Sequence, residues 1–435
     1  MRAKEGIAEE VLRRWKGEEY AFGVDVLDKV GEFASRFGKQ SVLVANGSRW
    51  LSPWLEKIIQ SLKNHGIDCR DLIKGARPNT PKDDVYRIAL AVSKSKPDSI
   101  VAVGGGSTLD AVKAASVLAS YKRSDIESYF GIGEVTKILK ETAERVIPIV
   151  AVQTASGSGS HLTRYSNITD PVTGNKKLIA DDAIVPSAAV FDYRVTLSAP
   201  RMLTLDGGLD GIAHCWEVFM GATGKCYYDQ IKGIAQLGIE LIVRNLAKAV
   251  EQPDNLAARV ALGLGTDLGG YAIMISKLNP NTGSVERGGT NAGHLGSFQL
   301  VRYLPHGRAC AVLNPYYTVL FAKAIEEQNR VVGPIFQRAG FIDSSVEFER
   351  IKGRKLALTI ARGMIEFSRS LGLPTTLNEA WVPKEQIEVM VGAAKDPQLK
   401  MKLQNMPIPM DVASVDALMR PTLQAAYNGE LSLVP

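Results

Sequence analysis

Features typical of secreted, membrane-spanning or metal-cluster proteins are missing from this sequence. Its 435 residues include 4 cysteines without CxxC spacing, which argues against a disulfide framework and a cysteine-rich zinc cluster. No apolar run approaches the roughly 20 residues that a membrane-spanning helix needs. The first thirty residues alternate charged and apolar side chains and contain no apolar core of a secretory signal. We therefore expect a cytoplasmic protein with reduced, mostly buried thiols.

A strong charge bias is also missing. The sequence has 52 Lys and Arg against 46 Asp and Glu, a net charge of +6, and these charges are spread along the chain. No block of like charges forms an arm for nucleic acid, so we expect neither a nucleic-acid partner nor a membrane partner. With 45% hydrophobic and 23% charged residues, the composition is that of a folded globular protein whose length allows two or three domains. We find no internal repeat and no low-complexity segment.

Two halves of the chain differ in their hydrophobic patterns. From about Gln40 to Phe191, amphipathic segments alternate with short apolar runs such as QSVLVA, SIVAVG and IPIVAV. This alternation predicts a parallel sheet with crossover helices, and strands that are apolar at every position are typical of sheets covered on both faces. Beyond about Leu197, long helical patterns dominate. We predict an α/β domain at residues 1–195, beginning with an extension of about 20 residues, and a helical domain at residues 196–435.

Two loops rich in glycine and hydroxyl groups follow two of the predicted strands. GGGST, residues 104–108, opens a predicted helix, and QTASGSGS, residues 153–160, follows the next apolar run. Free backbone N–H groups and the helix dipole at such a helix start bind phosphate. A tight turn capped by Ser107 or Thr108 is the alternative, since neither the GxGxxG nor the Walker pattern is complete. Because parallel strands end at one edge of a sheet, the two loops together favour a dinucleotide site.

Histidine is scarce, so its placement is informative. Of 5 histidines, His214 lies four residues after Asp210, which places both side chains on one face of a predicted helix. His294 and His306 lie further along the helical half. Three imidazoles and one carboxylate can bind a divalent metal and leave room for a substrate oxygen. A surface Asp–His pair and buried, hydrogen-bonded histidines are the alternatives that this pattern leaves open.

Five segments occur here in the order seen in one enzyme family. They are GGGSTLDAVKA, TASGSGSHLTRYSNITD, KKLIADDAIVPSAAVFDYRVTLSAP, DGGLDGIAH and LPHGRACAVLNP. From about Phe22 to beyond Pro315, the chain thereby resembles the iron-containing (group III) alcohol dehydrogenases. The resemblance implies a dehydroquinate synthase-like architecture, with a Rossmann-like, parallel-sheet α/β dinucleotide-binding domain, an all-α C-terminal domain and an active site in the cleft between them.

The resemblance also implies roles for individual residues. The implied metal ligands are Asp210, His214 and His306, to which we add His294 as the third histidine. The implied cofactor contacts are Asn46, Asn79, Gly105, Gly106, Ser107, Asp110, Thr154, Ser158 and Lys177. The metal would be Fe²⁺, with Zn²⁺ as the alternative because ligand type alone does not select iron. The cofactor would be NAD, with NADP as the alternative, and we expect a homodimer or a larger homo-oligomer.

The sequence departs from the family pattern at three positions near the implied site. Members usually carry two histidines four residues apart, whereas His294 stands alone here, with Thr290 four residues before it. Because a hydroxyl group is a poor substitute for an imidazole ligand, we assign His294 to the metal. Asn46 stands where many members have an aspartate that repels a 2′-phosphate, so NAD is favoured only slightly over NADP. His161 replaces a usual acidic residue, and we expect it at the surface, with a role in substrate or cofactor binding as the alternative.

The implied reaction is hydride transfer between a nicotinamide and a primary alcohol or aldehyde, assisted by a metal ion acting as a Lewis acid. Alternatives with the same architecture are a glycerol or polyol-phosphate dehydrogenase and a dehydroquinate-synthase-like enzyme, for which Arg287 gives only a hint of a phosphate site. A nucleotide-binding protein without catalysis is the alternative from another class. The sequence does not identify the substrate, because four aromatic residues could line a pocket or belong to the core. These are Trp216, Phe219, Phe298 and Tyr303.

Overall fold

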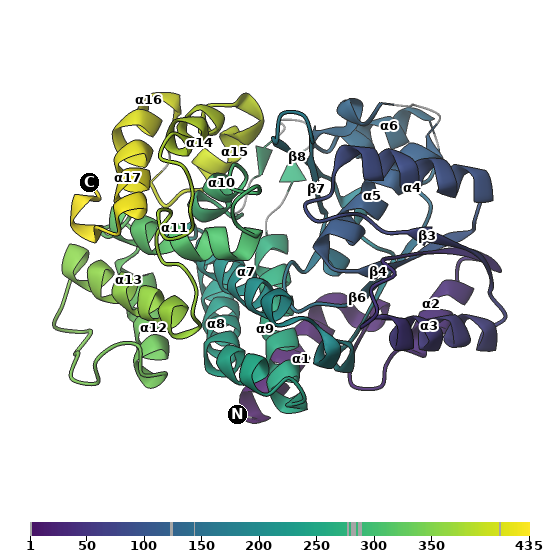
Figure 1. The fold of residues 1–435 in the computed structure, drawn as a ribbon, viewed down its shortest axis with the longest axis horizontal. Coiled ribbons are helices and arrows are strands. Elements are labelled where there is room, and N and C mark those ends of the chain that lie inside the picture. The colour runs from purple at the N-terminus through teal and green to yellow at the C-terminus, as the bar shows by residue number, and fades with distance from the viewer. Residues whose placement is uncertain are drawn as a thin grey trace.

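The computed structural model describes most of the chain. It covers residues 2–121, 125–142, 144–275, 278–279, 284–285, 289–408 and 410–435. Figure 1 shows an α/β half, which contains the early strands and helices α2 to α6, beside a half built from helices α7 to α17. The predicted fold class is therefore confirmed. Within the described residues, no helix combines the length and the hydrophobicity that a membrane crossing requires.

A six-stranded parallel sheet forms the centre of the α/β half, in the order β1-β9-β6-β4-β2-β3. Its strands are β1 (Tyr20–Gly23), β2 (Gln40–Ala45), β3 (Asp68–Lys74), β4 (Ser99–Gly104), β6 (Ile149–Gln153) and β9 (Ala188–Asp192). From β2 the chain moves to β3 on one side and then to β4 and β6 on the other. This reversal places the carboxyl ends of β2 and β4 side by side, where doubly wound sheets bind ligands.

Helices cover both faces of this sheet (Figure 1). Helices α2 (Lys29–Ser35) and α3 (Ser52–Asn64) pack on one face, and α4 (Lys82–Ser95) and α5 (Gly106–Ser120) pack on the other. In β4, Val101 and Val103 belong to the hydrophobic cluster beneath α2 and α3, whereas Ile100 and Ala102 belong to the cluster beneath α4 and α5. Because both faces are buried, β4 is apolar along its length, as the sequence predicted.

A smaller sheet packs beside α5. It contains β5 (Gly131–Ile132), β8 (Lys176–Ala180) and β7 (Tyr165–Thr169), with β7 and β8 antiparallel. Elsewhere in the chain are α6 (Glu134–Thr142) and the short pair β10 (Leu278–Asn279) and β11 (Ser284–Val285). The importance of β8 for the site is that its alternating side chains face opposite sides of the sheet.

Three long helices form the centre of the helical half: α7 (Arg201–Met220), α8 (Tyr228–Glu251) and α9 (Leu256–Met274). Around them lie α10 (Ala292–Ser297), α11 (His306–Leu320), α12 (Glu326–Arg338), α13 (Gly353–Ser370), α14 (Gln386–Ala394), α15 (Lys400–Gln404), α16 (Val412–Ser414) and α17 (Arg420–Asn428). One hydrophobic core connects these helices. Most of α7 is buried, because α8, α9 and α11 all pack against it.

Helix α1 (Arg2–Lys16) packs on the helical half although it precedes the sheet in the chain. Ala8 and Leu12 are fully buried in the helical core. Trp15 stacks on Tyr271 of α9, with ring centroids 4.4 Å apart. The chain then enters the sheet as edge strand β1. The extension expected from the sequence is thus a helix that connects the two halves.

Candidate active site between the two halves

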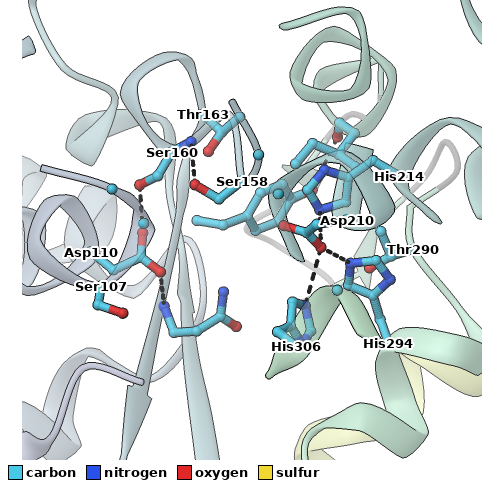
Figure 2. Close-up of a pocket in the computed structure, with 18 of the residues that line it drawn as sticks. Ser107, Asp110, Ser158, Ser160, Thr163, Asp210, His214, Thr290, His294 and His306 are labelled. Carbon is cyan, nitrogen blue, oxygen red and sulfur yellow. Dashed lines mark hydrogen bonds and ion pairs between the residues drawn. The ribbon is translucent and has the colours of Figure 1, made fainter. Parts of the chain in front are cut away.

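A cavity of about 240 Å³ lies between the carboxyl edge of the sheet and helices α7, α10 and α11. Figure 2 shows side chains of the α/β half along one wall and side chains of the helical half along the other. The predicted residues on the first wall are Asn79, Gly105, Gly106, Ser107, Asp110 and Ser158. Those on the second wall are Asp210, His214, His294 and His306. The cavity therefore brings all four predicted metal ligands and six of the nine predicted cofactor contacts together.

Asp210 lies within reach of three histidines. Its Oδ1 atom is 3.7 Å from the Nε2 atoms of His214, His294 and His306 (Figure 2). This distance is too long for a hydrogen bond. However, two ligands that each lie about 2.0–2.2 Å from a tetrahedral metal ion are separated by roughly 3.3–3.6 Å. Each of the three distances from Asp210 is therefore close to that expected between two ligands of one ion.

The protonation of the cluster also fits a metal ion. Asp210 Oδ1 and His294 Nε2 are buried and lack a hydrogen-bond partner among the described residues. Burial raises the pKa of Asp210 to about 7 and lowers that of His214 to about 4. Burial also lowers the pKa of His294 and of His306 well below the usual value. Neutral imidazoles offer the lone pairs that a metal needs, and a cation at Oδ1 would offset the cost of burying the carboxylate.

Three helices supply these ligands. Asp210 and His214 are one turn apart on α7, whereas His294 comes from α10 and His306 is the first residue of α11. The start of α11 packs directly on α7, because a Cβ atom at Gly307 would lie 1.9 Å from the carbonyl oxygen of Asp206. Glycine at this position therefore allows His306 to approach Asp210.

Glu217 and Ser297 orient two of the histidine rings. The fully buried Glu217 accepts a hydrogen bond of 2.8 Å from Nδ1 of His294, which leaves Nε2 directed at Asp210. Ser297 Oγ lies 2.8 Å from Nδ1 of His306. Such partners fix the tautomer and raise the basicity of a ligand. The sequence analysis did not identify either residue, although Glu217, seven residues after Asp210, lies on the same face of α7.

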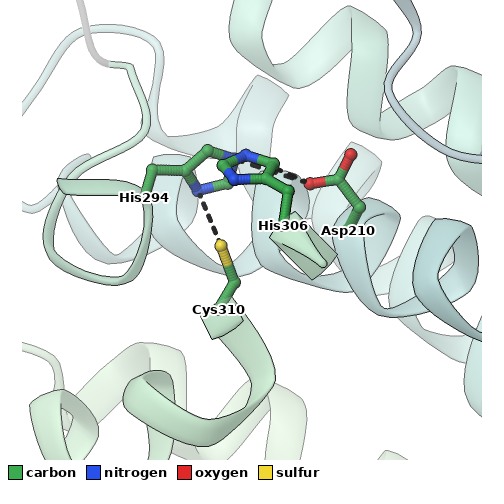
Figure 3. A group of neighbouring side chains, drawn as sticks. All are labelled: Asp210, His294, His306 and Cys310. Carbon is green, nitrogen blue, oxygen red and sulfur yellow. Dashed lines mark hydrogen bonds and ion pairs between the residues drawn. The ribbon is translucent and has the colours of Figure 1, made fainter. Parts of the chain in front are cut away.

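Cys310 is close to the cluster but lies on the other side of the His294 ring (Figure 3). Its Sγ is 3.7 Å from Nδ1 of His294, the nitrogen that faces Glu217. Ligand atoms of Cys310, Asp210, His294 and His306 all lie within 4.8 Å of one another. Burial, however, raises the pKa of the Cys310 thiol well above its usual value, which disfavours the thiolate that binds metals. We therefore do not add Cys310 to the predicted ligands. His214 is not part of this group of four, although its Nε2 also lies 3.7 Å from Oδ1 of Asp210.

On the other wall, Asp110 connects the two glycine-rich loops. Its carboxylate accepts hydrogen bonds from Ser160 Oγ (2.6 Å) and from the backbone N–H of Asn167 (3.0 Å). The backbone N–H of Asn79 donates to Ser107 Oγ (3.0 Å), which holds a third loop against the start of α5. The predicted phosphate-binding segment is thus fixed from two sides.

Lys176, and not the predicted Lys177, is the lysine that lines the cavity. Lys177 forms an ion pair with Glu127 at 2.6 Å, near the surface. Lys176 is buried and donates a hydrogen bond of 3.1 Å to Oδ1 of Asn79. Successive residues of a strand point to opposite faces, so only one of the two lysines can face the cavity. The prediction was displaced by one residue.

Two other predicted cofactor contacts do not line the cavity. The side-chain amide of Asn46 donates to the carbonyl oxygen of Ala76 (3.0 Å) and to Thr108 Oγ1 (3.3 Å). Thr154 is buried, and its backbone N–H donates to the carbonyl oxygen of Gly104 at 3.2 Å. Both residues therefore stabilise loops at the carboxyl edge of the sheet.

His161 is buried, so its expected surface position is wrong. Its Nε2 lies 3.1 Å from the hydroxyl oxygen of Tyr20 and 3.3 Å from Oδ1 of Asp267 on α9. The carboxylate of Asp267 also accepts a hydrogen bond of 2.5 Å from Tyr20. No local pattern in the sequence indicates these partners, because they lie more than a hundred residues away on either side of His161.

Of the four aromatic candidates, Phe298 alone lines the cavity. Trp216 and Phe219 are fully buried in the helical core, and Tyr303 is 38% exposed. Arg287, the hint of a phosphate site, lies outside the described residues.

Comparisons with known proteins identify the family. Residues 17–193 match the family described as iron-containing alcohol dehydrogenase, and residues 204–423 match the C-terminal region of the same family. The chain therefore belongs to the iron-containing alcohol dehydrogenase family, as its motifs indicated.

Relatives with named activities are also found. The chain is similar to 1,3-propanediol dehydrogenase of Klebsiella pneumoniae, with 32% identity over 299 residues, which covers 68% of this chain and 71% of that protein. It is 25% identical over 416 residues to long-chain-alcohol dehydrogenase 1 of Geobacillus thermodenitrificans, which covers 94% and 95% of the two chains. A crystal structure of a 1,3-propanediol oxidoreductase superposes with a TM-score of 0.77 at 25% identity, covering 94% of this chain and 98% of that one.

Proposed function

We propose that this protein is a metal-dependent alcohol dehydrogenase that transfers hydride between NAD or NADP and a primary alcohol or aldehyde. The observation that carries the proposal is the position of Asp210 Oδ1, 3.7 Å from three imidazole nitrogens, in a cavity whose opposite wall is the glycine-rich start of α5. Family membership and relatives such as 1,3-propanediol dehydrogenase support the reaction class. We choose Fe²⁺ because of the family, and Zn²⁺ suits the same donor set.

The residues of the two walls have different tasks in this proposal. Asp210 and the three histidines would hold a divalent metal ion, which would supply a Lewis acid for the substrate oxygen, and the opposite wall would hold a nicotinamide cofactor as the hydride carrier. Glu217 keeps Nδ1 of His294 occupied, so that the lone pair on Nε2 stays available.

The opposite wall orients the cofactor. Gly105, Gly106 and Ser107 form the start of α5, where backbone N–H groups and the helix dipole favour a pyrophosphate. Asn46, at the end of β2, brings no negative charge against a 2′-phosphate, and its amide is already hydrogen-bonded to the loop after β3. NADP therefore stays an acceptable cofactor beside NAD.

The cellular setting and the assembly are further parts of the proposal. A cytoplasmic location agrees with four free cysteines, of which Cys215 and Cys310 are buried. A homodimer or larger homo-oligomer agrees with edge strand β1, which pairs only with β9 in the described sheet and so offers backbone groups to a second copy. We place the boundary between the two domains near residue 195, where the last strand of the sheet is followed by α7.

Metal analysis combined with kinetics tests this function. We expect a chelator to abolish aldehyde-dependent oxidation of NADH and Fe²⁺ to restore it. We expect His214→Ala to lose bound metal and turnover but to retain NADH binding, measured by elemental analysis and fluorescence titration, because the metal and the cofactor occupy opposite walls. The control His65→Ala, at the end of α3, should keep both.

Two outcomes would contradict the proposal. Unchanged metal content in His214→Ala would refute the ligand assignment. Tight cofactor binding without turnover of any carbonyl compound would favour the nucleotide-binding protein without catalysis.

A further inference from the structure

Two lysines of the cavity wall have no carboxylate within ion-pair distance among the described residues. Lys402 of α15 is 6% exposed and Lys176 of β8 is 9% exposed. The ammonium group of Lys402 donates to the hydroxyl of Thr290, and that of Lys176 donates to the amide oxygen of Asn79. Among the described residues, neither lysine forms an ion pair, although both face the same cavity.

Both ammonium groups lie near one aromatic ring beside the histidine cluster. The centroid of the Phe298 ring is 5.3 Å from Nζ of Lys402 and 5.9 Å from Nζ of Lys176. The same ring is 6.1 Å from the ring of His306, measured between centroids. A substrate with its reacting oxygen at the histidine cluster therefore needs only a short carbon chain to reach Lys402.

The positions on either side of His294 hold Lys402 in place. Thr290, four residues before His294, accepts its hydrogen bond, and Phe298, four residues after His294, lies beneath its ammonium group. The wall that carries His294 therefore also holds a positive charge in a fixed position. A hydrogen bond from a charged donor to an anionic oxygen is stronger than one from a neutral donor.

The balance of charge in the cavity leaves these lysines unpaired. A divalent ion would balance the buried carboxylates of Asp210 and Glu217, and Asp110 lies 3.8 Å from Lys113. A buried cation without a counter-charge is costly. Burial lowers the pKa of Lys176 and of Lys402 to about 8, and this effect outweighs the attraction of each lysine to Asp210 and to one further carboxylate, Asp110 for Lys176 and Glu217 for Lys402.

The two lysines differ in position. Lys176 contacts Asn79 on the cofactor wall, whereas Lys402 contacts Thr290 on the wall that carries the histidines. The negative charge of a bound cofactor can therefore compensate Lys176. Lys402 lies on the wall that carries the histidines, where the reacting end of a substrate would bind, and the cofactor charge does not compensate it.

We propose that Lys402 binds an anionic group of the substrate. Building on the proposed function, the substrates are short aldehydes or alcohols that carry a carboxylate, sulfonate or phosphate at the end opposite the reacting carbon. Lys402 is a specificity residue in this scheme and takes no part in the hydride transfer.

The test compares charged and neutral aldehydes of similar length. The probes are butanal and three anionic aldehydes: 4-oxobutanoate, 3-oxopropane-1-sulfonate and 3-oxopropyl phosphate. We expect wild-type metal-loaded enzyme to prefer at least one anionic probe over butanal by tenfold or more in kcat/KM. Lys402→Met should abolish that preference, mainly through KM, and leave kcat/KM for butanal within about twofold. Lys400→Met, on the exposed side of the same helix, should behave as wild type.

Thr290→Val provides a second variant if Lys402→Met does not fold, because it removes the hydroxyl that holds Lys402 and keeps the charge. It should weaken the preference for the anionic probe severalfold. Unchanged preference in the variants, or a wild-type preference for butanal over all three anions, overturns the inference while the alcohol dehydrogenase function stands.

Binding without turnover separates the two proposals. If no aldehyde is reduced, the proposed function fails, and calorimetry with butanedioate on the metal-loaded protein still decides the role of Lys402. Binding to wild type that is lost in Lys402→Met supports the anion site. Equal binding by both proteins, or binding by neither, overturns it.

Discussion

Glu217 determines which nitrogen of His294 is available to a metal ion. The carboxylate is fully buried, and besides Nδ1 of His294 it accepts hydrogen bonds from Asn314 Nδ2 (3.1 Å) and from the backbone N–H of Asn291 (2.7 Å). The backbone N–H of His294 also donates to Glu217 (3.3 Å), so four donors hold this carboxylate beside the His294 ring. A charged partner at Nδ1 makes Nε2 a stronger donor to a metal than a neutral partner would.

We expect Glu217→Gln to lower metal affinity by about 10–100-fold, because the amide still accepts the hydrogen bond but carries no charge. A competition titration with a chromophoric chelator measures this change. Glu240→Gln is the matched control, since Glu240 is also a buried helical carboxylate but pairs with Lys4 and Arg338, away from the cavity. Equal metal affinity in wild type and Glu217→Gln would show that the charge has no influence on the site.

Single residues of the site differ in how well the sequence predicts them. Asp210 and His214 share one helix turn, so their spacing alone brings them together. His294 and His306 depend on how three helices pack. The scarcity of histidine suggested both, the family resemblance then implied His306, and His294 was added as the third histidine. The prediction named Lys177 instead of Lys176 for another reason. Successive side chains of a strand point to opposite faces, and the KKLI sequence does not indicate which of its two lysines faces the cavity.

Among the elements, α7 and the loop after β6 approach each other unusually closely. A Cβ atom at Gly207 of α7 would lie 1.7 Å from the carbonyl oxygen of Ser156. This loop carries Ser158 and Ser160 of the wall proposed to bind the cofactor, and α7 carries Asp210 of the wall proposed to bind the metal. The contact therefore sets the separation between the two walls.

We expect Gly207→Ala to lower the free energy of unfolding by about 1–3 kcal/mol or more, because the added methyl group meets backbone that cannot rotate away. NADH affinity should fall at the same time, since the loop is displaced. Gly233→Ala is the matched control on α8, where a Cβ atom meets nothing within 4 Å, and it should stabilise the protein by about 0.5–1 kcal/mol. Denaturant titration and NADH fluorescence measure both effects; a Gly207→Ala protein as stable as wild type would contradict the close contact.

The elements that the sequence predicted best are those with the most uniform environment. The central strands β2, β4 and β6 are buried on both faces, and their apolar runs are visible directly. Strand β3, DCRDLIK, lies at the sheet edge and mixes charged with apolar residues, so its pattern is weak. The placement of α1 on the helical half was likewise not predictable, because its partners on α8 and α9 lie far along the chain.

In the molecule as a whole, the two halves are joined by a buried polar network. Asp267 of α9 accepts hydrogen bonds from Tyr20 of β1 (2.5 Å) and from Tyr193 (3.4 Å), and it lies 3.3 Å from Nε2 of His161. Burial raises the pKa of Tyr20 well above its usual value, so this phenol stays protonated and keeps donating. Because the sheet and the helices share this network, we expect the two halves to unfold together.

The same network gives the stability of the protein a dependence on pH. Burial lowers the pKa of His161 below that of an exposed histidine, and this effect outweighs the opposing attraction of Asp267. As the pH falls through about 6.5, the unfolded chain takes up a proton at this position that the folded chain does not. The free energy of unfolding then decreases, with a slope of up to about 1.4 kcal/mol per pH unit from this residue.

We expect His161→Gln to be less stable than wild type at pH 7, because the imidazole contacts with Tyr20 and Asp267 are lost. Between pH 7 and pH 5, however, its free energy of unfolding should decrease less than that of wild type. The other buried histidines are common to both proteins, so their contributions cancel in the difference. Denaturant unfolding of the metal-loaded proteins at pH 7, 6 and 5 gives the two curves. Parallel curves would show that His161 has the same pKa in the folded and unfolded chains and would contradict the prediction. If wild type instead gained stability relative to His161→Gln as the pH fell, His161 would be protonated in the folded protein and paired with Asp267.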